Sequence, residues 1–175
     1  MLLRRILPNR LAVFLKRCYR KARVRLVSGF YGNPAKQLKV IAITGTNGKT
    51  TTANYINEVF KAARFKTAMF STAVIEQAGQ RHINDLNMSV ASTTTMQRFF
   101  RDAVRGKVDY VILEATSHSL YQHKLDGVPI DTAVMTNLTQ DHLDYHSRGS
   151  QTILYLIVMM NGSSISPNTP LRADS

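Results

Sequence analysis

The segment from Ile41 to Thr52 constrains this chain more than any other feature, and it reads Ile-Ala-Ile-Thr-Gly-Thr-Asn-Gly-Lys-Thr-Thr-Thr. An apolar run rich in β-branched residues leads into a turn bracketed by two glycines, and Lys-Thr opens the helical pattern that follows. Glycine lets such a turn close tightly and point its backbone N–H groups at phosphate oxygens. The pattern predicts a strand, a phosphate-binding loop and a helix, in that order.

The residue types in this loop suit a nucleoside triphosphate. Lys49 can reach the outer phosphates, the hydroxyl of Thr50 can bind Mg²⁺, and the helix N-terminus adds partial positive charge. The full P-loop consensus is not met, because Ile43 stands where that consensus has its first glycine. A purely structural glycine turn is the alternative. We expect a nucleoside triphosphate to contact the loop residues Gly45, Thr46, Asn47, Gly48, Lys49, Thr50 and Thr51.

The positive charge of the chain is concentrated at its N-terminus. The 175 residues carry a net charge of +12, but residues 1–39 contain 11 Lys or Arg and no acid. Residues 40–175 contain 12 basic and 11 acidic residues, so the rest of the chain is nearly neutral. A nucleic-acid-binding surface on the fold would need its own basic patch, and we therefore expect no nucleic-acid partner.

Residues 1–37 form an N-terminal arm in which Lys and Arg interrupt every apolar run. No stretch approaches the roughly 20 apolar residues of a membrane-spanning helix. Two interpretations remain open: a basic amphipathic helix on an anionic membrane surface, or a helix packed on the body or on a partner. Gly29, Gly32 and Pro34 should end this helix. The single cysteine, Cys18, suits a cytoplasmic protein, located at the inner membrane face if the arm binds lipid.

From residue 38 onward, strand-like and helix-like patterns alternate. We expect strands at 38–44, 66–72, 108–114 and 131–136, helices at 50–64 and 94–104, and a hairpin or loop over 73–87. The first helix should bury one face, made of Ala53, Ile56, Val59, Phe60 and Ala63. The second should bury Met96, Phe99, Phe100, Ala103 and Val104. This order predicts an α/β fold with a three-layer, P-loop-like, mostly parallel sheet, whose ligands bind at the carboxyl ends of its strands.

Polar clusters follow three of the predicted strands, at residues 45–50, 114–118 and 137–146. Glu114 should emerge beside the phosphate loop, where its carboxylate would hold Mg²⁺ together with Thr50. Capping of the next helix is the alternative role for this residue. The histidines nearby lack zinc-type spacing, so we expect any Mg²⁺ to arrive with the nucleotide; they are His118, His123, His142 and His146.

Three segments together resemble the ATP-dependent Mur ligases, in particular the central domain of the UDP-N-acetylmuramoyl-tripeptide synthetases. They are Thr44–Thr52, Leu113–Leu120 (Leu-Glu-Ala-Thr-Ser-His-Ser-Leu) and Thr136–His146 (Thr-Asn-Leu-Thr-Gln-Asp-His-Leu-Asp-Tyr-His). The resemblance implies that ATP phosphorylates a carboxylate of a UDP-muramoyl-peptide precursor, and that an amino acid then attacks the acyl phosphate to form an amide. Such catalysis rests on positioning and on charge neutralisation by Lys and Mg²⁺.

The resemblance also implies roles for individual residues. Lys49 would contact the transferred phosphate, Thr50 and Glu114 would hold one Mg²⁺, and His142 would serve a second. The expected catalytic residues are therefore Lys49, Glu114 and His142, and Asn137 is expected to contact the nucleotide. Precursor binding is expected at Ser89, Thr116, Gln122 and Lys124.

The chain departs from the family pattern in several places. Lys124 stands where the family has an arginine, and a lysine cannot form the bidentate pair that an arginine forms with an acid. Ser89-Val90-Ala91 stands where the family has Thr-Thr-Pro. The basic arm stands where the family has a UDP-binding domain. No lysine follows Lys124 to be carbamoylated between two magnesium ions. We therefore expect residues 38–146 to be a partial ATP-binding domain, inactive as a ligase by itself and cut short in the gene, and residues 147–175 to be an atypical, disordered tail.

Two other functions remain open. The chain could be a membrane-associated nucleotide-binding protein without ligase activity, anchored by its arm. It could also be a fragment of a ligase of the folylpolyglutamate or cyanophycin type. The Asp-His-Leu-Asp-Tyr-His segment, residues 141–146, favours the muramoyl branch.

Overall fold

A computed structural model describes residues 9–77, 79–84, 92–116, 119–120, 122 and 124–137 of the chain. Within helix α1 the side chains of residues 9–14, 16 and 17 are not described. The predictions made for Ser89, for the four histidines at 118, 123, 142 and 146, and for residues 147–175 lie outside the described residues.

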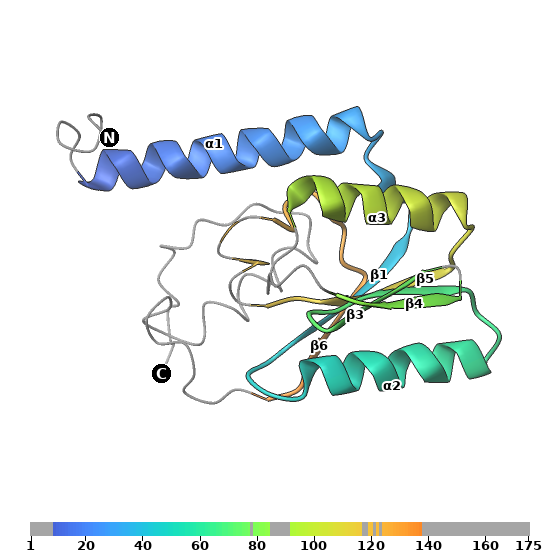
Figure 1. The fold of residues 1–175 in the computed structure, drawn as a ribbon. Coiled ribbons are helices and arrows are strands. Elements are labelled where there is room, and N and C mark those ends of the chain that lie inside the picture. Colours follow the sequence, from blue (N-terminus) through green and yellow to red (C-terminus); the bar gives the residue numbers. More distant parts are fainter. Residues whose placement is uncertain are drawn as a thin grey trace.

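A six-stranded, mostly parallel sheet forms the centre of the described structure (Figure 1). Its strands, in the spatial order β4-β3-β2-β5-β1-β6, are β4 (Gln80–Ile83), β3 (Val74–Gln77), β2 (Thr67–Phe70), β5 (Tyr110–Glu114), β1 (Lys39–Thr44) and β6 (Thr132–Met135). Strand β1 pairs in parallel with β5 and β6, and β2 pairs in parallel with β5. At one edge, β3 and β4 form an antiparallel hairpin, the first of the two alternatives for residues 73–87.

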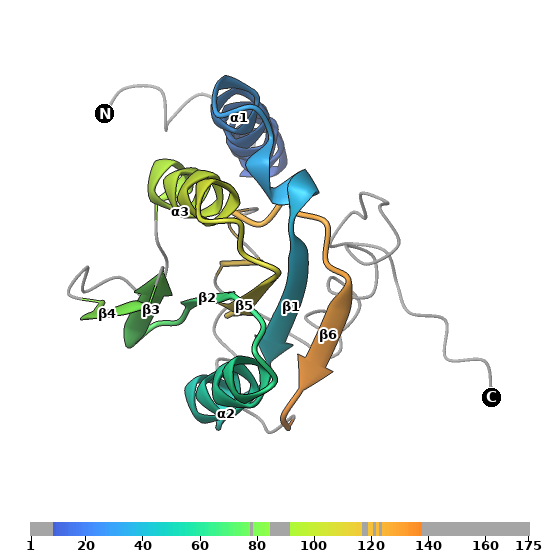
Figure 2. The same cartoon turned by 90° about the vertical axis from the view of Figure 1, so that its right-hand side faces the viewer.

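Helices cover both faces of the sheet (Figures 1 and 2). Helix α2 (Lys49–Ala62) lies on one face, and α3 (Thr93–Arg105) lies on the other with the short 3-10 helix η2 (Pro34–Gln37). Helix α1 (Asn9–Phe30) packs on the outside of α3. The predicted three-layer α/β architecture is confirmed, and α1 adds an outer layer to it.

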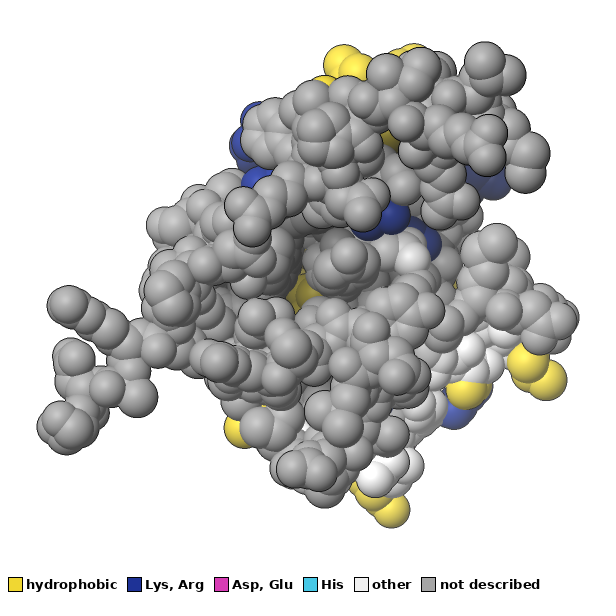
Figure 3. All heavy atoms as spheres, turned by 90° about the vertical axis from the view of Figure 1, so that its left-hand side faces the viewer, with side chains coloured by type: hydrophobic (Ala, Val, Ile, Leu, Met, Phe, Trp, Pro, Cys, Tyr) yellow, Lys and Arg dark blue, Asp and Glu magenta, His cyan; other side chains and the backbone are white. Residues whose placement is uncertain are grey.

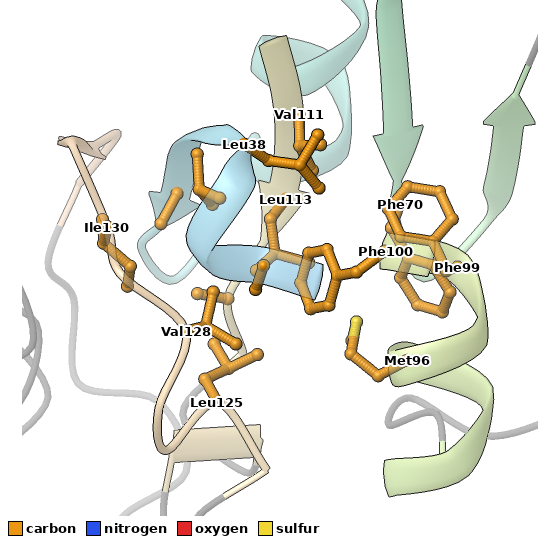
Figure 4. Packing of buried hydrophobic residues seen from close by; sticks show 14 of the residues in the cluster. Leu38, Phe70, Met96, Phe99, Phe100, Val111, Leu113, Leu125, Val128 and Ile130 are labelled. Carbon is orange, nitrogen blue, oxygen red and sulfur yellow. The ribbon is translucent and has the colours of Figure 1, made fainter. Parts of the chain in front are cut away.

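The main core lies between the sheet and α3 (Figure 4). Strands β1 and β5 are apolar along their length because both of their faces are covered, as is usual for central parallel strands. The rings of Phe70 and Phe99 meet edge to face with centroids 5.1 Å apart, and Phe100 is fully buried beside them. Each such side chain contributes about 1.5–3 kcal/mol to folding. The buried face predicted for α3 is confirmed for Met96, Phe99, Phe100 and Ala103, and Val104 is partly buried.

The buried face predicted for α2 is wrong in part. Val59 is 65% exposed and Ala63 is exposed just after the helix, whereas Asn57 is fully buried. The reason is tertiary: Asn57 Nδ2 donates to the carboxylate of Glu76 on β3 at 3.1 Å, which draws a polar position of the helix toward the sheet. Phe60 keeps its apolar role through an edge contact with Tyr110, at 4.7 Å between ring centroids.

The described part of the arm is mainly helix α1, which is held against the body. Val24 is 2% exposed, and the guanidinium of Arg101 on α3 lies 5.0 Å from the centre of the Tyr31 ring. The helix ends at Phe30, and Gly32 adopts φ 77° in the turn that follows, as the glycines predicted. Among the described residues, no helix combines the length and the apolarity that crossing a membrane requires.

Candidate nucleotide site

The turn after β1 requires glycine at its first position. Gly45 has φ +139° and Gly48 has φ +79°, and side chains rarely tolerate either value. Gly45 is also crowded, because a Cβ atom there would meet the hydroxyl of Thr136 and lie 2.9 Å from the carbonyl oxygen of Asn137. The loop thus lies directly against the end of β6.

Asn137 organises the loop amides. Its Oδ1 accepts hydrogen bonds from the N–H of Thr46 at 3.1 Å and from that of Asn47 at 2.9 Å. The hydroxyl of Thr136 donates to the carbonyl of Asn47 at 2.6 Å. The N–H groups of Thr46 and Asn47, which we expected to bind phosphate, therefore donate to the side-chain oxygen of Asn137. A phosphate that binds these two N–H groups would have to displace that oxygen. Asn137 lies at the loop as expected, and direct contact with nucleotide stays a prediction.

The positive charge of the site comes from Lys49 and from the start of α2. The ammonium of Lys49 folds back over the loop and donates to the carbonyls of Gly45 at 2.7 Å and Thr46 at 2.8 Å. Within the described ranges, no acidic side chain pairs with it. Gly48 is the N-cap and offers no side-chain acceptor, so the first N–H groups of α2 keep their capacity to bind an anion. Thr51 lies exposed in this first turn.

Glu114 ends β5 beside the loop and is only 7% exposed. Its Oε2 accepts three hydrogen bonds: from the hydroxyl of Thr50 at 3.0 Å, from the N–H of Thr72 at 2.9 Å and from the hydroxyl of Thr72 at 3.1 Å. All three donors are neutral, and no Lys or Arg in the described part of the chain pairs with Glu114. A buried carboxylate next to a threonine hydroxyl supplies the hard oxygen ligands that Mg²⁺ prefers. The residues present thus fit the predicted metal.

Thr72 is a site residue that the sequence analysis missed. It follows β2, and β2 pairs in parallel with β5, so the ends of these strands meet at one edge of the sheet. The rule that placed Glu114 at the site, that parallel strands end at one edge of the sheet, also predicts Thr72 there. The expected range of the strand, 66–72, hid Thr72 inside the strand, whereas β2 ends at Phe70.

Three of the four residues expected to bind the precursor, Thr116, Gln122 and Lys124, lie in the segment after β5. Thr116 accepts a hydrogen bond at its hydroxyl from the N–H of Ser119 at 3.1 Å, and so shapes this turn. Lys124 lies beside α1: its pKa is lowered first by burial and then by repulsion from Arg23 and Arg20. Gln122 lies in the described turn between them. Their contact with a precursor stays a prediction.

A second buried carboxylate lies at the hairpin edge of the sheet. Glu76 on β3 is 4% exposed, and it accepts hydrogen bonds from Lys61 Nζ at 2.7 Å and from Asn57 Nδ2 at 3.1 Å. The pKa of Lys61 is raised, first by its hydrogen bond to Glu76 and then by that to Glu58. Arg81 approaches the same carboxylate at 3.9 Å. Unlike Glu114, Glu76 therefore has cationic side chains of the same chain beside it.

Several known ligases have similar sequences. Residues 43–155 match the family model of the Mur ligase middle domain. The UDP-N-acetylmuramoyl-L-alanyl-D-glutamate--2,6-diaminopimelate ligase of Clostridium botulinum is 41% identical over 127 residues, which are 73% of this chain and 26% of that protein. That of Bacillus velezensis is 38% identical over 170 residues, 92% of this chain and 33% of that protein. The chain thus spans about a quarter to a third of the length of these relatives.

A comparison with solved structures points to the same kind of ligase. A UDP-N-acetylmuramoyl-L-alanyl-D-glutamate--2,6-diaminopimelate ligase matches with a TM-score of 0.56 and 28% identity, over 66% of this chain and 24% of that one. E. coli FolC, solved with DHPP and ADP, matches with a TM-score of 0.57 at 23% identity, over 80% and 38% of the two chains. The second likeness concerns the fold alone. By its sequence and by its fold, the chain belongs to the Mur ligase family and carries that family's middle domain.

Proposed function

We propose that this chain binds ATP with Mg²⁺ at residues 45–51 and serves the amide-forming reaction of peptidoglycan precursor synthesis. In that reaction the terminal phosphoryl group of ATP moves to a carboxylate oxygen of a UDP-muramoyl-peptide, and ADP leaves. The amine of an amino acid then attacks the acyl carbon, and phosphate leaves as the amide bond forms. One observation carries the proposal: Glu114 and Thr50 meet at 3.0 Å beside a loop that has a lysine at the start of a helix.

The residues of the chain have separate tasks in this proposal. The ammonium of Lys49 leaves the carbonyls of the loop and neutralises the outer phosphates, while the first amides of α2 hold phosphate oxygens. Thr50 and Glu114 would hold Mg²⁺, which supplies further charge neutralisation. His142 would serve a second Mg²⁺. Ser89, Thr116, Gln122 and Lys124 would hold the precursor.

Calorimetric titration of the full chain with ATP and Mg²⁺ tests the proposal. Lys49→Ala should weaken binding about 10- to 100-fold, because a hydrogen bond to a charged group contributes about 1.5–3 kcal/mol. Lys66→Ala is the matched control, since Lys66 is an exposed lysine just before β2. Binding that is absent in the wild type, or equal in both variants, would overturn the proposal.

We also propose that the chain is cytoplasmic and associates peripherally with anionic membrane surfaces through residues 1–37. The charge of this arm supports the idea, since residues 1–39 contain 11 basic residues and no acid. Flotation with vesicles of phosphatidylcholine and phosphatidylglycerol tests it. Binding should require the anionic lipid and should fall as salt is raised. Equal binding to neutral vesicles would contradict it.

A further inference from the structure

Among the described side chains of helix α1, the larger apolar ones point away from the body. Val24 and Ser28 face inward and are 2% and 7% exposed. Four large side chains on the other side of the helix are 48%, 67%, 75% and 88% exposed, and they are Leu15, Tyr19, Leu26 and Phe30. Positions i, i+4, i+11 and i+15 fall along one line of an α-helix, so these four residues form a continuous outer stripe.

The outer stripe is held outward, because α1 packs on α3 and its end is fixed to the turn that leads into η2, which also packs on α3. The N–H of Asn33 donates to the carbonyl of Ser28 at 2.8 Å, and the hydroxyl of Ser28 donates to Asn33 Oδ1 at 3.1 Å. Tyr31 contacts the guanidinium of Arg101 on α3. With Val24 buried as well, the rotation of the helix about its axis is set. The outer stripe therefore stays on the surface of the outermost layer (Figures 1 and 2).

Cationic side chains border the outer stripe. Arg23 and Arg25 are both exposed, and helical spacing places them on its two sides. In the part of the chain that the structure describes, neither forms an ion pair with an acid. Figure 3 shows hydrophobic side chains emerging at the top of the molecule, where Figure 1 places α1, with Lys and Arg side chains below them.

An apolar centre with cationic margins complements the interface of an anionic bilayer, where apolar groups enter the acyl boundary and arginines meet lipid phosphates. A second copy of the chain would fit the outer stripe less well than a bilayer does. Two such stripes placed face to face would bring cationic margins together, and no acid on α1 would compensate them.

We propose that the outer stripe of α1 is a docking surface for an anionic phospholipid bilayer. Leu15, Tyr19, Leu26 and Phe30 enter the headgroup–acyl boundary, and Arg23 and Arg25 contact lipid phosphates. The inference rests on the peripheral association proposed above and specifies the face that makes the contact. Because α2 lies on the opposite side of the sheet from α1 (Figure 2), the bound protein keeps its phosphate loop away from the lipid.

Flotation of the full chain with vesicles of phosphatidylcholine and phosphatidylglycerol tests the surface. The double variant Leu26→Ser with Phe30→Ser should reduce vesicle binding at least tenfold. The matched control is Tyr55→Ser with Val59→Ser, which removes two apolar side chains of α2 that are 71% and 65% exposed. That control should bind within about twofold of the wild type, since a small change in exposed area away from the contact alters little.

A charge pair completes the test. Arg25→Glu should weaken binding to anionic vesicles, whereas Arg98→Glu, an exposed position on α3, should weaken it much less. All of these positions are exposed, so circular dichroism and thermal melts should match the wild type. Calorimetric titration with ATP and Mg²⁺ should give the same affinity with and without vesicles.

Each outcome decides the matter. If the wild type binds anionic vesicles and the stripe variant binds equally well, the peripheral association stands and the outer stripe is overturned as its surface. If a lipid-free dimer forms and the stripe variant abolishes it, the occupant is a second copy. Vesicles that block nucleotide binding would overturn the orientation. A wild type that ignores the vesicles removes both membrane proposals and leaves the nucleotide site untouched.

Discussion

Glu114 and Glu76 are both buried carboxylates on strands of one sheet, at 7% and 4% exposure, yet they have opposite surroundings. Glu76 accepts a hydrogen bond from the ammonium of Lys61 at 2.7 Å. Glu114 accepts hydrogen bonds from the hydroxyls of two threonines and from one backbone N–H. Removing a charge from water is costly, and a cationic partner offsets the cost more fully than neutral donors do.

This difference distinguishes Glu76, which stabilises the fold, from Glu114, which we propose to bind Mg²⁺. Glu76 is neutralised by its own chain and ties α2 to β3. Glu114 has no cationic partner among the described residues. It lies at the carboxyl end of β5, next to the loop of residues 45–51. Burial alone does not distinguish the two residues, whereas the charge of the donors does.

The largest expected effect concerns Glu76, the carboxylate that stabilises the fold. Glu76→Leu leaves Asn57 without the acceptor for its Nδ2, and the Oδ1 of Asn57 already lacks a partner among the described residues. We expect a loss of about 2–4 kcal/mol in the free energy of unfolding, because each buried unpaired polar group costs about 1–3 kcal/mol. Urea denaturation followed by circular dichroism measures it. A loss below about 0.5 kcal/mol would show that Glu76 does not stabilise the fold.

Neutralising the other carboxylate should affect binding rather than folding. Glu114→Gln keeps an acceptor for Thr50 and Thr72 and removes a charge that has no cationic partner among the described residues. The free energy of unfolding should therefore change by less than about 1 kcal/mol. ATP affinity should lose its dependence on Mg²⁺, which calorimetry with and without EDTA measures. Unchanged Mg²⁺ dependence would remove Glu114 from the proposed metal site.

The donors to Glu114 allow a finer distinction. Thr72→Val removes one hydroxyl donor while the backbone N–H of residue 72 still donates, so we expect a loss of about 0.5–1.5 kcal/mol in stability. Its effect on the Mg²⁺ dependence of ATP binding should be small. Thr50→Val, which also removes a hydroxyl proposed to bind the metal, should weaken that dependence clearly. If the two variants behave alike in calorimetry, Thr50 is not a metal ligand.

The smallest expected effect concerns Lys61, whose side chain is 38% exposed. Lys61→Met should cost about 0.2–1 kcal/mol, because solvent screens a partly exposed ion pair. The raised pKa of Lys61 means that the pair contributes fully below the ordinary value of 10.5, and that this contribution is lost as the pH rises through the raised pKa. The stability difference between wild type and variant should therefore shrink above pH 10.5. A difference that is constant with pH would assign it to packing.

The framework of this molecule could be predicted from local patterns. Strands β1 and β5 are buried on both faces and therefore appear as apolar runs. The face of α3 follows the helical period, from Met96 to Ala103. The phosphate loop is a local feature too, because its glycines and Lys49 are contiguous. Both Glu114 and Asn137 could be placed at the loop, since parallel strands end at the same edge.

Other features depended on partners that are distant along the chain. Val59 was expected to be buried and Asn57 was not, because the helical period does not reveal that Asn57 faces the carboxylate of Glu76 on β3. The orientation of α1 shows the same limit. The pattern of the arm left packing and membrane contact open, and only the structure shows that Leu26 and Phe30 are exposed.

By itself, the sequence determined the order of the elements, the loop and the family, because these depend on periodicity and on residues adjacent in the chain. Only the tertiary structure decided which buried carboxylate has a cation and which side of α1 is outside. Glu114 meets Thr50 across 64 positions and Thr72 across 42, and folding alone brings them together. The charge that surrounds a buried group is a property of the assembled sheet, and here it decides where a metal and a nucleotide are expected.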